Sequence, residues 1–262
     1  MALPDSLYRP DGDGWVATEL TRGPWNPDHQ HAGPPAALLA RAIERAGAIE
    51  GGETRRLAYD ILAPVPLGPV QVDTRVLRAG RRVEQIEATL TSEGSRPLMR
   101  ATGWRTRTAP SDEVATPEPP PPPPQNARAL GLASWPGDDA VAYRDALEWR
   151  WVEGSFDVPG PACVWGRVTV PLVTGEPISP LERLLVMADA ASGVSAELDW
   201  AAWLFVNLDL TIHLERPPEG EWLAMDARTR IGDSGAGVCT AVLSDEHGRV
   251  GVSAQALLVE PR

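Results

Sequence analysis

Residues 179–192 read SPLERLLVMADAAS, and this stretch decides the class of fold. Its apolar residues recur at helical spacing and would form one stripe: Leu181, Leu184, Leu185 and Ala188. Ser179 is a good N-cap, Pro180 fits the first helical turn, and Glu182 can complete a capping box. The stretch therefore predicts an amphipathic helix that packs against another layer by one face.

An earlier stretch has the same character. Residues 34–46 read PPAALLARAIERA, with apolar side chains at 38, 39, 42, 43 and 46. Each predicted helix is followed by four runs whose alternation and composition are typical of strands. The first set covers residues 56–62, 70–78, 84–91 and 98–106, and the second covers 204–214, 221–230, 237–244 and 250–259. The pattern of a helix followed by antiparallel strands occurs twice in the sequence. It predicts an α+β fold in which two tandem repeats form one continuous sheet.

A proline-rich stretch divides the two repeats. Residues 117–124 read PEPPPPPP, which has almost no backbone N–H groups to offer a sheet and favours an extended spacer. We therefore expect an N-terminal repeat over residues 1–108, a linker over 109–140 and a C-terminal repeat over 141–262. A ligand for a proline-binding module is the alternative interpretation of this stretch.

All 24 basic residues of the chain are arginine, because the sequence contains no lysine. This excludes a Schiff-base lysine and a Walker-type phosphate loop. The 262 residues carry a formal net charge of −12, which argues against nucleic acid and anionic membranes as partners. A local cluster of arginines could still hold an anionic ligand.

The sequence favours a cytoplasmic location. Residues 1–14 are polar and predict no signal peptide, and no apolar run approaches the roughly 18–20 residues that span a bilayer. Cys163 and Cys239 are too few to build a disulfide framework or a zinc site by themselves. We therefore expect a soluble intracellular protein with neither a metal nor a cofactor.

Four short motifs accompany the predicted elements. They are HAGPPAALLARA at 31–42, LLVMADAASG at 184–193, VNLDLTIHLERP at 206–217 and VSAQALL at 252–258. Their order and residues resemble those of the double-hotdog acyl-CoA thioesterases, in particular the bacterial thioesterase II type. The resemblance implies a double-hotdog fold, hydrolysis of an acyl-CoA thioester to free acid and CoA, a role in lipid metabolism, and assembly into a homo-oligomer.

The resemblance also indicates candidate site residues. Asp189 takes the place of the family's catalytic Asp, Gln255 that of its catalytic Gln, and Asn207 stands where the family has Thr. Thioester hydrolysis needs a polarised water and donors for the oxyanion, and a carboxylate beside two neutral hydrogen-bonding side chains meets the first need. The helix start at Gly33, with the preceding Ala32, is the candidate oxyanion and substrate-binding site.

Each of these assignments has a structural alternative. Asp189 borders the apolar stripe of its predicted helix, where it could instead cap a neighbouring turn. Gln255 and Asn207 could be strand residues with hydrogen bonds inside the sheet. Asp209 is a second candidate for the carboxylate, because it would point to the same sheet face as Asn207. Arg41 occupies the position in the first helix that matches Asp189, so we expect one competent site per chain.

His29 and His31 lie in WNPDHQH, residues 25–31, which is similar to the hydratase version of the hotdog fold. The acid of that motif would fall on Pro24, and a metal site would need a third ligand, so we expect both histidines in a solvated loop. A hotdog-fold enoyl-CoA hydratase or dehydratase and a non-catalytic acyl-CoA binding protein are the alternatives to a hydrolase. Four tryptophans could line an acyl tunnel or simply pack the core: Trp104, Trp165, Trp200 and Trp203.

Overall fold

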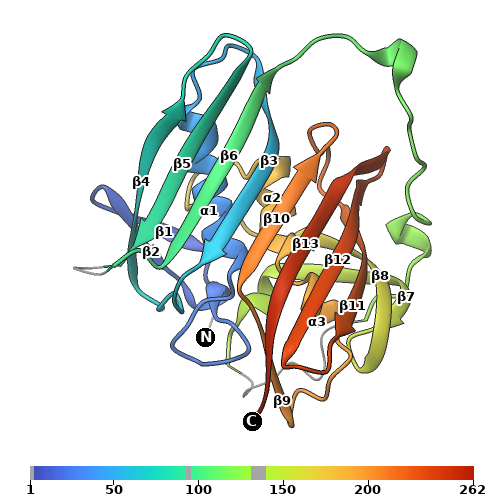
Figure 1. The fold of residues 1–262 in the computed structure, drawn as a ribbon. Helices are drawn as coiled ribbons and strands as arrows, with labels where there is room; N and C mark the ends of the chain where they lie inside the picture. The colour runs from blue at the N-terminus through green and yellow to red at the C-terminus, as the bar shows by residue number, and fades with distance from the viewer. Residues whose placement is uncertain (1–2, 93–95, 131–139) are drawn as a thin grey trace.

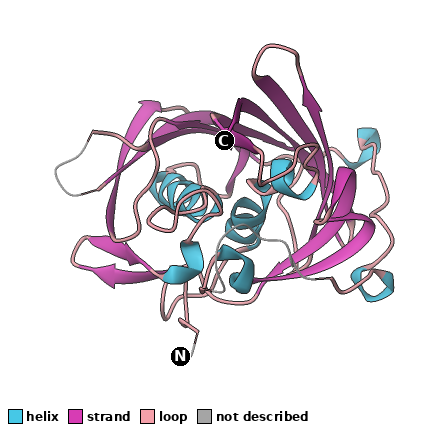
Figure 2. Cartoon of the chain, turned by 90° about the horizontal axis from the view of Figure 1, so that it is seen from below, coloured by secondary structure: helices cyan, strands magenta, loops and turns pink. Residues whose placement is uncertain are grey.

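The computed structural model describes residues 3–92, 96–130 and 140–262. These residues form a sheet of 13 strands whose paired neighbours are antiparallel (Figure 1). The sheet curves around the main helices, which lie on its inner side (Figure 2). The predicted α+β fold with one continuous sheet is confirmed.

The first half of the chain builds one end of the sheet. Its elements are β1 (Tyr8–Asp11), β2 (Gly14–Ala17), α1 (Gly33–Ala46), β3 (Gly52–Ile61), β4 (Pro69–Arg78), β5 (Val83–Thr91) and β6 (Met99–Arg107). Helix α1 begins at the predicted place, with Pro34 in its first turn, and its apolar face is buried against the sheet. Tyr59 of β3 donates a hydrogen bond to the carbonyl of Ala36 (3.1 Å) and ties the sheet to this helix.

The second half builds the other end. Its elements are β7 (Leu147–Ser155), β8 (Val158–Val168), α2 (Pro180–Ala188), α3 (Ala191–Val194), β9 (Trp203–Asn207), β10 (Asp209–Leu214), β11 (Leu223–Ile231), β12 (Ala236–Asp245) and β13 (Gly248–Pro261). Within the described residues, four short 3₁₀ helices lie in connections along both halves: η1 (Glu19–Thr21), η2 (Asp112–Val114), η3 (Pro124–Asn126) and η4 (Tyr143–Ala146). The predicted capping box starts α2, because the side chains of Ser179 and Glu182 each accept the other's backbone N–H (3.1 and 2.8 Å).

Strands β3 and β10 join the two halves in register, with Asp209 opposite Asp60 and Ile212 opposite Leu57. Across the sheet the order is β1-β2-β4-β5-β6-β3-β10-β13-β12-β11-β8-β7, and β9 pairs with the end of β13. Helices α1 and α2 pack against each other behind the sheet in the view of Figure 1. None of the helices in the described part of the chain has the length and apolar character that crossing a membrane requires.

Two predicted elements are each interrupted in the structure. The helix expected over residues 179–192 breaks after Ala188 into α2 and α3, and the strand expected over 204–214 breaks at Leu208 into β9 and β10. At the second break the N–H of Leu208 still donates to the carbonyl of Ala256 in β13 (2.9 Å). Both interruptions adjoin residues of the candidate site, so they set where its side chains point.

The proline-rich stretch is held against the second half of the sheet. The indole N–H of Trp165 donates to the carbonyl of Pro122 (2.8 Å), and Glu118 forms an ion pair with Arg249 (2.9 Å). The described part of segment 109–140 contains η2 and η3 and contributes no strand. Residues 131–139 of the predicted linker lie outside the described residues.

Candidate active site

A cavity of about 350 Å³ lies between the two halves of the chain. The first half lines it with loop residues between 23 and 32 and between 61 and 65. The second half lines it with the segment around the α2–α3 break, with β9, and with Phe156 and Trp200. Of the predicted site residues, Asp189, Asn207 and Ala32 lie in this wall.

Asp189 lies in the break that separates α2 from α3. In an uninterrupted helix its carbonyl would accept the N–H of Gly193, but that N–H bonds to Ala190 (3.0 Å). Two side-chain amides take its place: Gln255 Nε2 donates to the Asp189 carbonyl (3.0 Å), and Asn207 Nδ2 does so at 3.2 Å. The helix therefore breaks where residues of the sheet satisfy its backbone.

The same two amides hold the carboxylate of Asp189. Asn207 Nδ2 donates to Oδ1 at 2.7 Å and Gln255 Nε2 at 3.3 Å. Asp189 is only 4% exposed and Gln255 2%. Gln255 Oε1 is also buried, and no hydrogen-bond donor of the described residues contacts it. The structure thus brings the three predicted side chains together around one buried carboxylate.

Ser192 supports the orientation of the Asn207 amide. Its hydroxyl donates to Asn207 Oδ1 (2.9 Å), and Ser192 itself is buried in the cavity wall. Because the carboxylate and the carbonyl of Asp189 only accept hydrogen bonds, the amide nitrogen must face them, and the amide oxygen is left for the Ser192 hydroxyl. A reversed amide would place an oxygen against the carboxylate, which is repulsive. Sequence reasoning missed Ser192, although it lies one helical turn after Asp189.

His31 contacts both Asp189 and the start of α1. Its Nδ1 lies 3.2 Å from Asp189 Oδ2 and accepts the backbone N–H of Gly33 at 3.1 Å. Its ring stacks flat on Tyr143, with centroids 3.8 Å apart, and the Tyr143 hydroxyl donates to the carbonyl of Val186 (2.8 Å). The expectation of a solvated loop is wrong for His31, whose side chain is 10% exposed.

The proton on His31 Nδ1 decides between these two contacts, because one ring nitrogen cannot both accept from Gly33 and donate to Asp189. Burial lowers the pKa of His31, and the negative charge of Asp189 opposes that shift only in part. The imidazole is therefore neutral at neutral pH. Burial also raises the pKa of Tyr143 well above its usual value, so its hydroxyl stays protonated.

At Gly33 the start of α1 lies tightly against α2. A Cβ at this position would come well inside the 3.0 Å that real Cβ atoms keep, with the carbonyl oxygen of Val186 as the obstacle. The glycine therefore lets the start of α1 reach the end of α2. The side chain of His31 contacts both the amide of Gly33 and the carboxylate of Asp189, and so links the two groups.

Asp209 and Arg41 have other roles. The carboxylate of Asp209 accepts the N–H of Ala256 (2.6 Å), which repairs the ladder where β9 ends and β10 begins. Asp209 is not part of the cavity wall. Arg41 is buried and forms an ion pair with Glu176, so a cation fills the place in α1 that matches Asp189 in α2.

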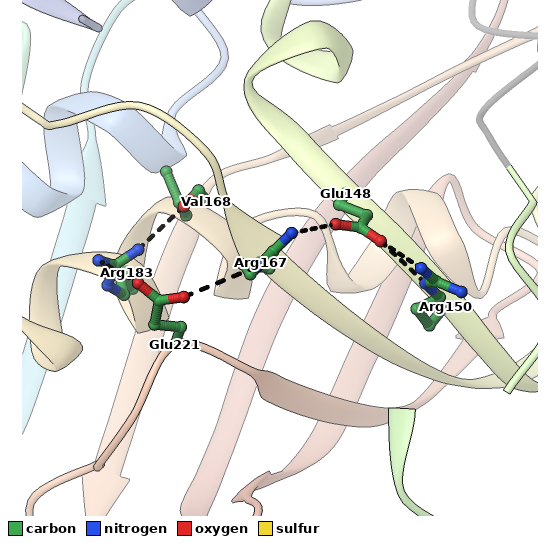
Figure 3. Close-up of polar contacts among 6 residues, drawn as sticks. All are labelled: Glu148, Arg150, Arg167, Val168, Arg183 and Glu221. Atoms are coloured by element: carbon green, nitrogen blue, oxygen red, sulfur yellow. Dashed lines mark hydrogen bonds and ion pairs between the residues drawn. The ribbon is translucent and has the colours of Figure 1, made fainter. Parts of the chain in front are cut away.

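A second cleft, of about 440 Å³, lies beside the start of α2. Its arginines are already paired with carboxylates (Figure 3). Glu221 lies 3.7 Å from Arg167 and 3.5 Å from Arg183, and Glu148 accepts from both Arg150 and Arg167 at 2.6 Å. The hydrogen bonds from Arg150 and Arg167 lower the pKa of Glu148, and the one from Arg150 has the larger effect. The carboxylate-and-amide arrangement of Asp189 is not repeated among the residues that line this cleft.

Of the four tryptophans expected near a tunnel, only Trp200 lines the first cavity. The ring of Trp104 lies under the guanidinium of Arg78, Trp165 is buried, and Trp203 is 37% exposed. Trp25, Phe156 and Phe205 join Trp200 in the cavity wall and were not singled out from the sequence.

Fold and site together define a class: a double-hotdog protein with a buried carboxylate at the interface of its repeats. Residues 21–106 match the family model of the acyl-CoA thioesterase N-terminal domain, and residues 112–259 match that of the C-terminal domain. The chain therefore belongs to the acyl-CoA thioesterase family and is a thioester hydrolase. No curated protein sequence matches it.

Solved structures confirm the fold. A conserved protein with a hot dog fold from Alicyclobacillus acidocaldarius aligns with a TM-score of 0.74 and 15% identity, covering 98% of this chain and 97% of its own. A protein described as a thioesterase II candidate from Thermobifida fusca YX gives 0.73 and 20%, covering 98% and 96%. The acyl-CoA thioesterase II TesB2 from Mycobacterium marinum gives 0.66 and 14%, also covering 98% and 96%.

Proposed function

We propose that this chain hydrolyses acyl-CoA thioesters by direct attack of a water molecule, with Asp189 as the general base. The observation that carries this proposal is the position of His31 Nδ1, 3.2 Å from Asp189 and 3.1 Å from the amide of Gly33. Asp189 of the second repeat and Ala32, which directly precedes α1 of the first, both line one cavity. A thioester carbonyl in that cavity would meet a base on one side and the helix N-terminus on the other.

The steps balance without a covalent enzyme intermediate. Asp189 takes a proton from the water as its oxygen bonds to the carbonyl carbon, and the carbonyl oxygen becomes an oxyanion. In this scheme the oxyanion replaces His31 Nδ1 as the acceptor of the Gly33 N–H. The tetrahedral intermediate then expels the thiolate of CoA, which takes up the proton and leaves the free acid. Asn207 and Gln255 keep the carboxylate oriented throughout.

His31 assists by sharing the proton that Asp189 receives. Its Nδ1 is close enough to Asp189 to accept that proton once the Gly33 N–H turns to the oxyanion. A protonated Nδ1 cannot accept a hydrogen bond from the Gly33 N–H. Proton transfer to His31 therefore frees that N–H to donate to the oxyanion. The stacked Tyr143 keeps the ring in this place.

Release of free thiol is the first test of this proposal. Incubation with CoA thioesters of different acyl groups should release one thiol and one carboxylic acid per thioester consumed. Two outcomes would contradict the proposal: loss of the double bond of an enoyl-CoA without thiol release, which defines a hydratase, or tight binding of acyl-CoA with no product at all.

A double-mutant cycle tests the amide orientation at Asn207. We expect Ser192→Ala to lower kcat about 2- to 10-fold, the value of one lost orienting hydrogen bond. In an Asn207→Thr background the same change should have almost no effect, because a hydroxyl donor has no amide to reverse. Thiol-release rates of the four proteins measure the coupling. Equal losses in both backgrounds would show that Ser192 acts in some other way.

A further inference from the structure

Aromatic side chains gather in one part of the cavity wall. They are Trp25, Phe156, Trp200 and Phe205. The chain has only two phenylalanines, and both lie here. Trp25 belongs to the loop before α1, whereas the other three belong to the second half of the chain. The aromatic wall is therefore assembled across the same interface that brings His31 to Asp189.

The four rings contact one another in offset and edge-on geometries. Trp25 stacks on Trp200 with centroids 4.9 Å apart and meets Phe205 edge-on at 5.0 Å. Trp200 also contacts Phe205 at 4.5 Å and Phe156 at 5.5 Å. Such arrangements present both ring faces and ring edges to a neighbour, and a further aromatic ring fits either of them.

These rings lie where the main hydrophobic core meets a smaller cluster, because Phe156 is part of the main core and Trp200 packs against both. Phe205 belongs to a small second cluster with Ala196, Leu257 and Val259, against which Trp25 and Trp200 pack. Trp25 and Trp200 are only partly buried, as expected for side chains that face a cavity. Part of the ring surface of Trp25 and Trp200 is therefore left uncovered by other side chains and is available to a ligand.

The size of the cavity limits the acyl group. A volume of about 350 Å³ lies near the lower end of the roughly 300–1,000 Å³ found for ligand pockets. Part of that room must take the thioester itself, so the cavity favours a compact acyl group over a long linear chain.

We propose that the acyl subsite selects a compact aryl or arylalkanoyl group, with benzoyl and phenylacetyl thioesters of CoA as representatives. The inference rests on the proposed function and names the substrate class of that site. The ring of the substrate lies against Trp200 and its neighbours, and its carbonyl lies between Asp189 and the start of α1. The wall that recognises the acyl group is made by both repeats.

Relative rates across acyl groups test the proposal. The thiol-release assay gives kcat/KM for the benzoyl, phenylacetyl, octanoyl and palmitoyl thioesters of CoA. We expect one of the two aryl substrates to give the highest value and palmitoyl-CoA the lowest. If palmitoyl- or octanoyl-CoA gives the highest value, the inference is overturned while the proposed function stands. If none of the four releases thiol, the proposed function itself fails.

Substitution of one ring separates aromatic recognition from simple apolar packing. Trp200→Leu keeps an apolar side chain but removes the ring, and it should lower kcat/KM for the preferred aryl substrate about 10-fold relative to octanoyl-CoA. Trp203→Leu is the matched control, because Trp203 is outside the cavity, and it should leave the ratio unchanged. Phe156→Leu removes a ring from another element and should shift the ratio in the same direction. An unchanged ratio in both cavity variants would refute aromatic selection.

Discussion

Asp189→Asn is expected to lower kcat by about 100- to 10,000-fold, the range over which a general base contributes to catalysis. Asparagine has nearly the shape of aspartate, and its Oδ1 can still accept from Asn207 and Gln255. Its Nδ2 would face His31 Nδ1 and donate to it. The geometry of the cleft is thus retained while the basic oxygen is lost. Thiol release under saturating substrate measures the effect.

The control for this prediction is Asp226→Asn. Asp226 is an exposed carboxylate on β11 and does not line the cavity, so its loss should leave kcat unchanged. Binding of acyl-CoA to Asp189→Asn, measured by calorimetry, should stay within a few-fold of the parent protein. Full turnover by Asp189→Asn would refute its assignment as the base.

Gly33→Ala is expected to reduce both stability and activity. The new methyl group has no room beside the carbonyl of Val186, so the start of α1 must move away from α2. Overpacking of this kind costs about 1–3 kcal/mol in the free energy of unfolding. Because a displacement of about 1 Å can cost 100-fold in rate, we expect kcat/KM to fall by about that factor. Urea unfolding and thiol release measure the two effects.

Gly232→Ala is the matched substitution. Gly232 follows β11, and a Cβ there would meet its nearest neighbour at an ordinary contact distance of 3.4 Å. We therefore expect little change in stability or activity. If Gly33→Ala behaved like Gly232→Ala, the close approach of α1 to α2 would not be what positions the site.

Much of the fold could be predicted because it depends on local patterns. The apolar period of residues 34–46, the capping residues Ser179 and Glu182, and the alternation of the strand runs all lie within one element each. The strands β1, β2, β7 and β8 lie outside the two predicted sets, and β8 is buried over five consecutive residues, which hides its alternation. The repeat boundaries near residues 108 and 141 stay predictions.

The candidate site was harder to predict because its geometry depends on two interruptions. At Asp189, side chains of β9 and β13 satisfy the backbone carbonyl, and at Leu208 the neighbouring Asp209 accepts a backbone N–H of β13; such long-range partners leave no local signal in the sequence. The sequence predicts a solvated loop at His31 because nothing local indicates its stacking on Tyr143, 112 positions further along. The only available signal was its place two residues before the glycine that starts α1.

A crystal structure of the Asp189→Asn protein with a bound acyl-CoA tests the central claim most directly. We expect the thioester carbonyl oxygen at the amide of Gly33, the acyl group against Trp200, and space for a water about 3–3.5 Å from the carbonyl carbon on the side of residue 189. Acyl-CoA bound instead in the cleft between Arg167 and Arg183, with its carbonyl away from residues 33 and 189, would contradict the account.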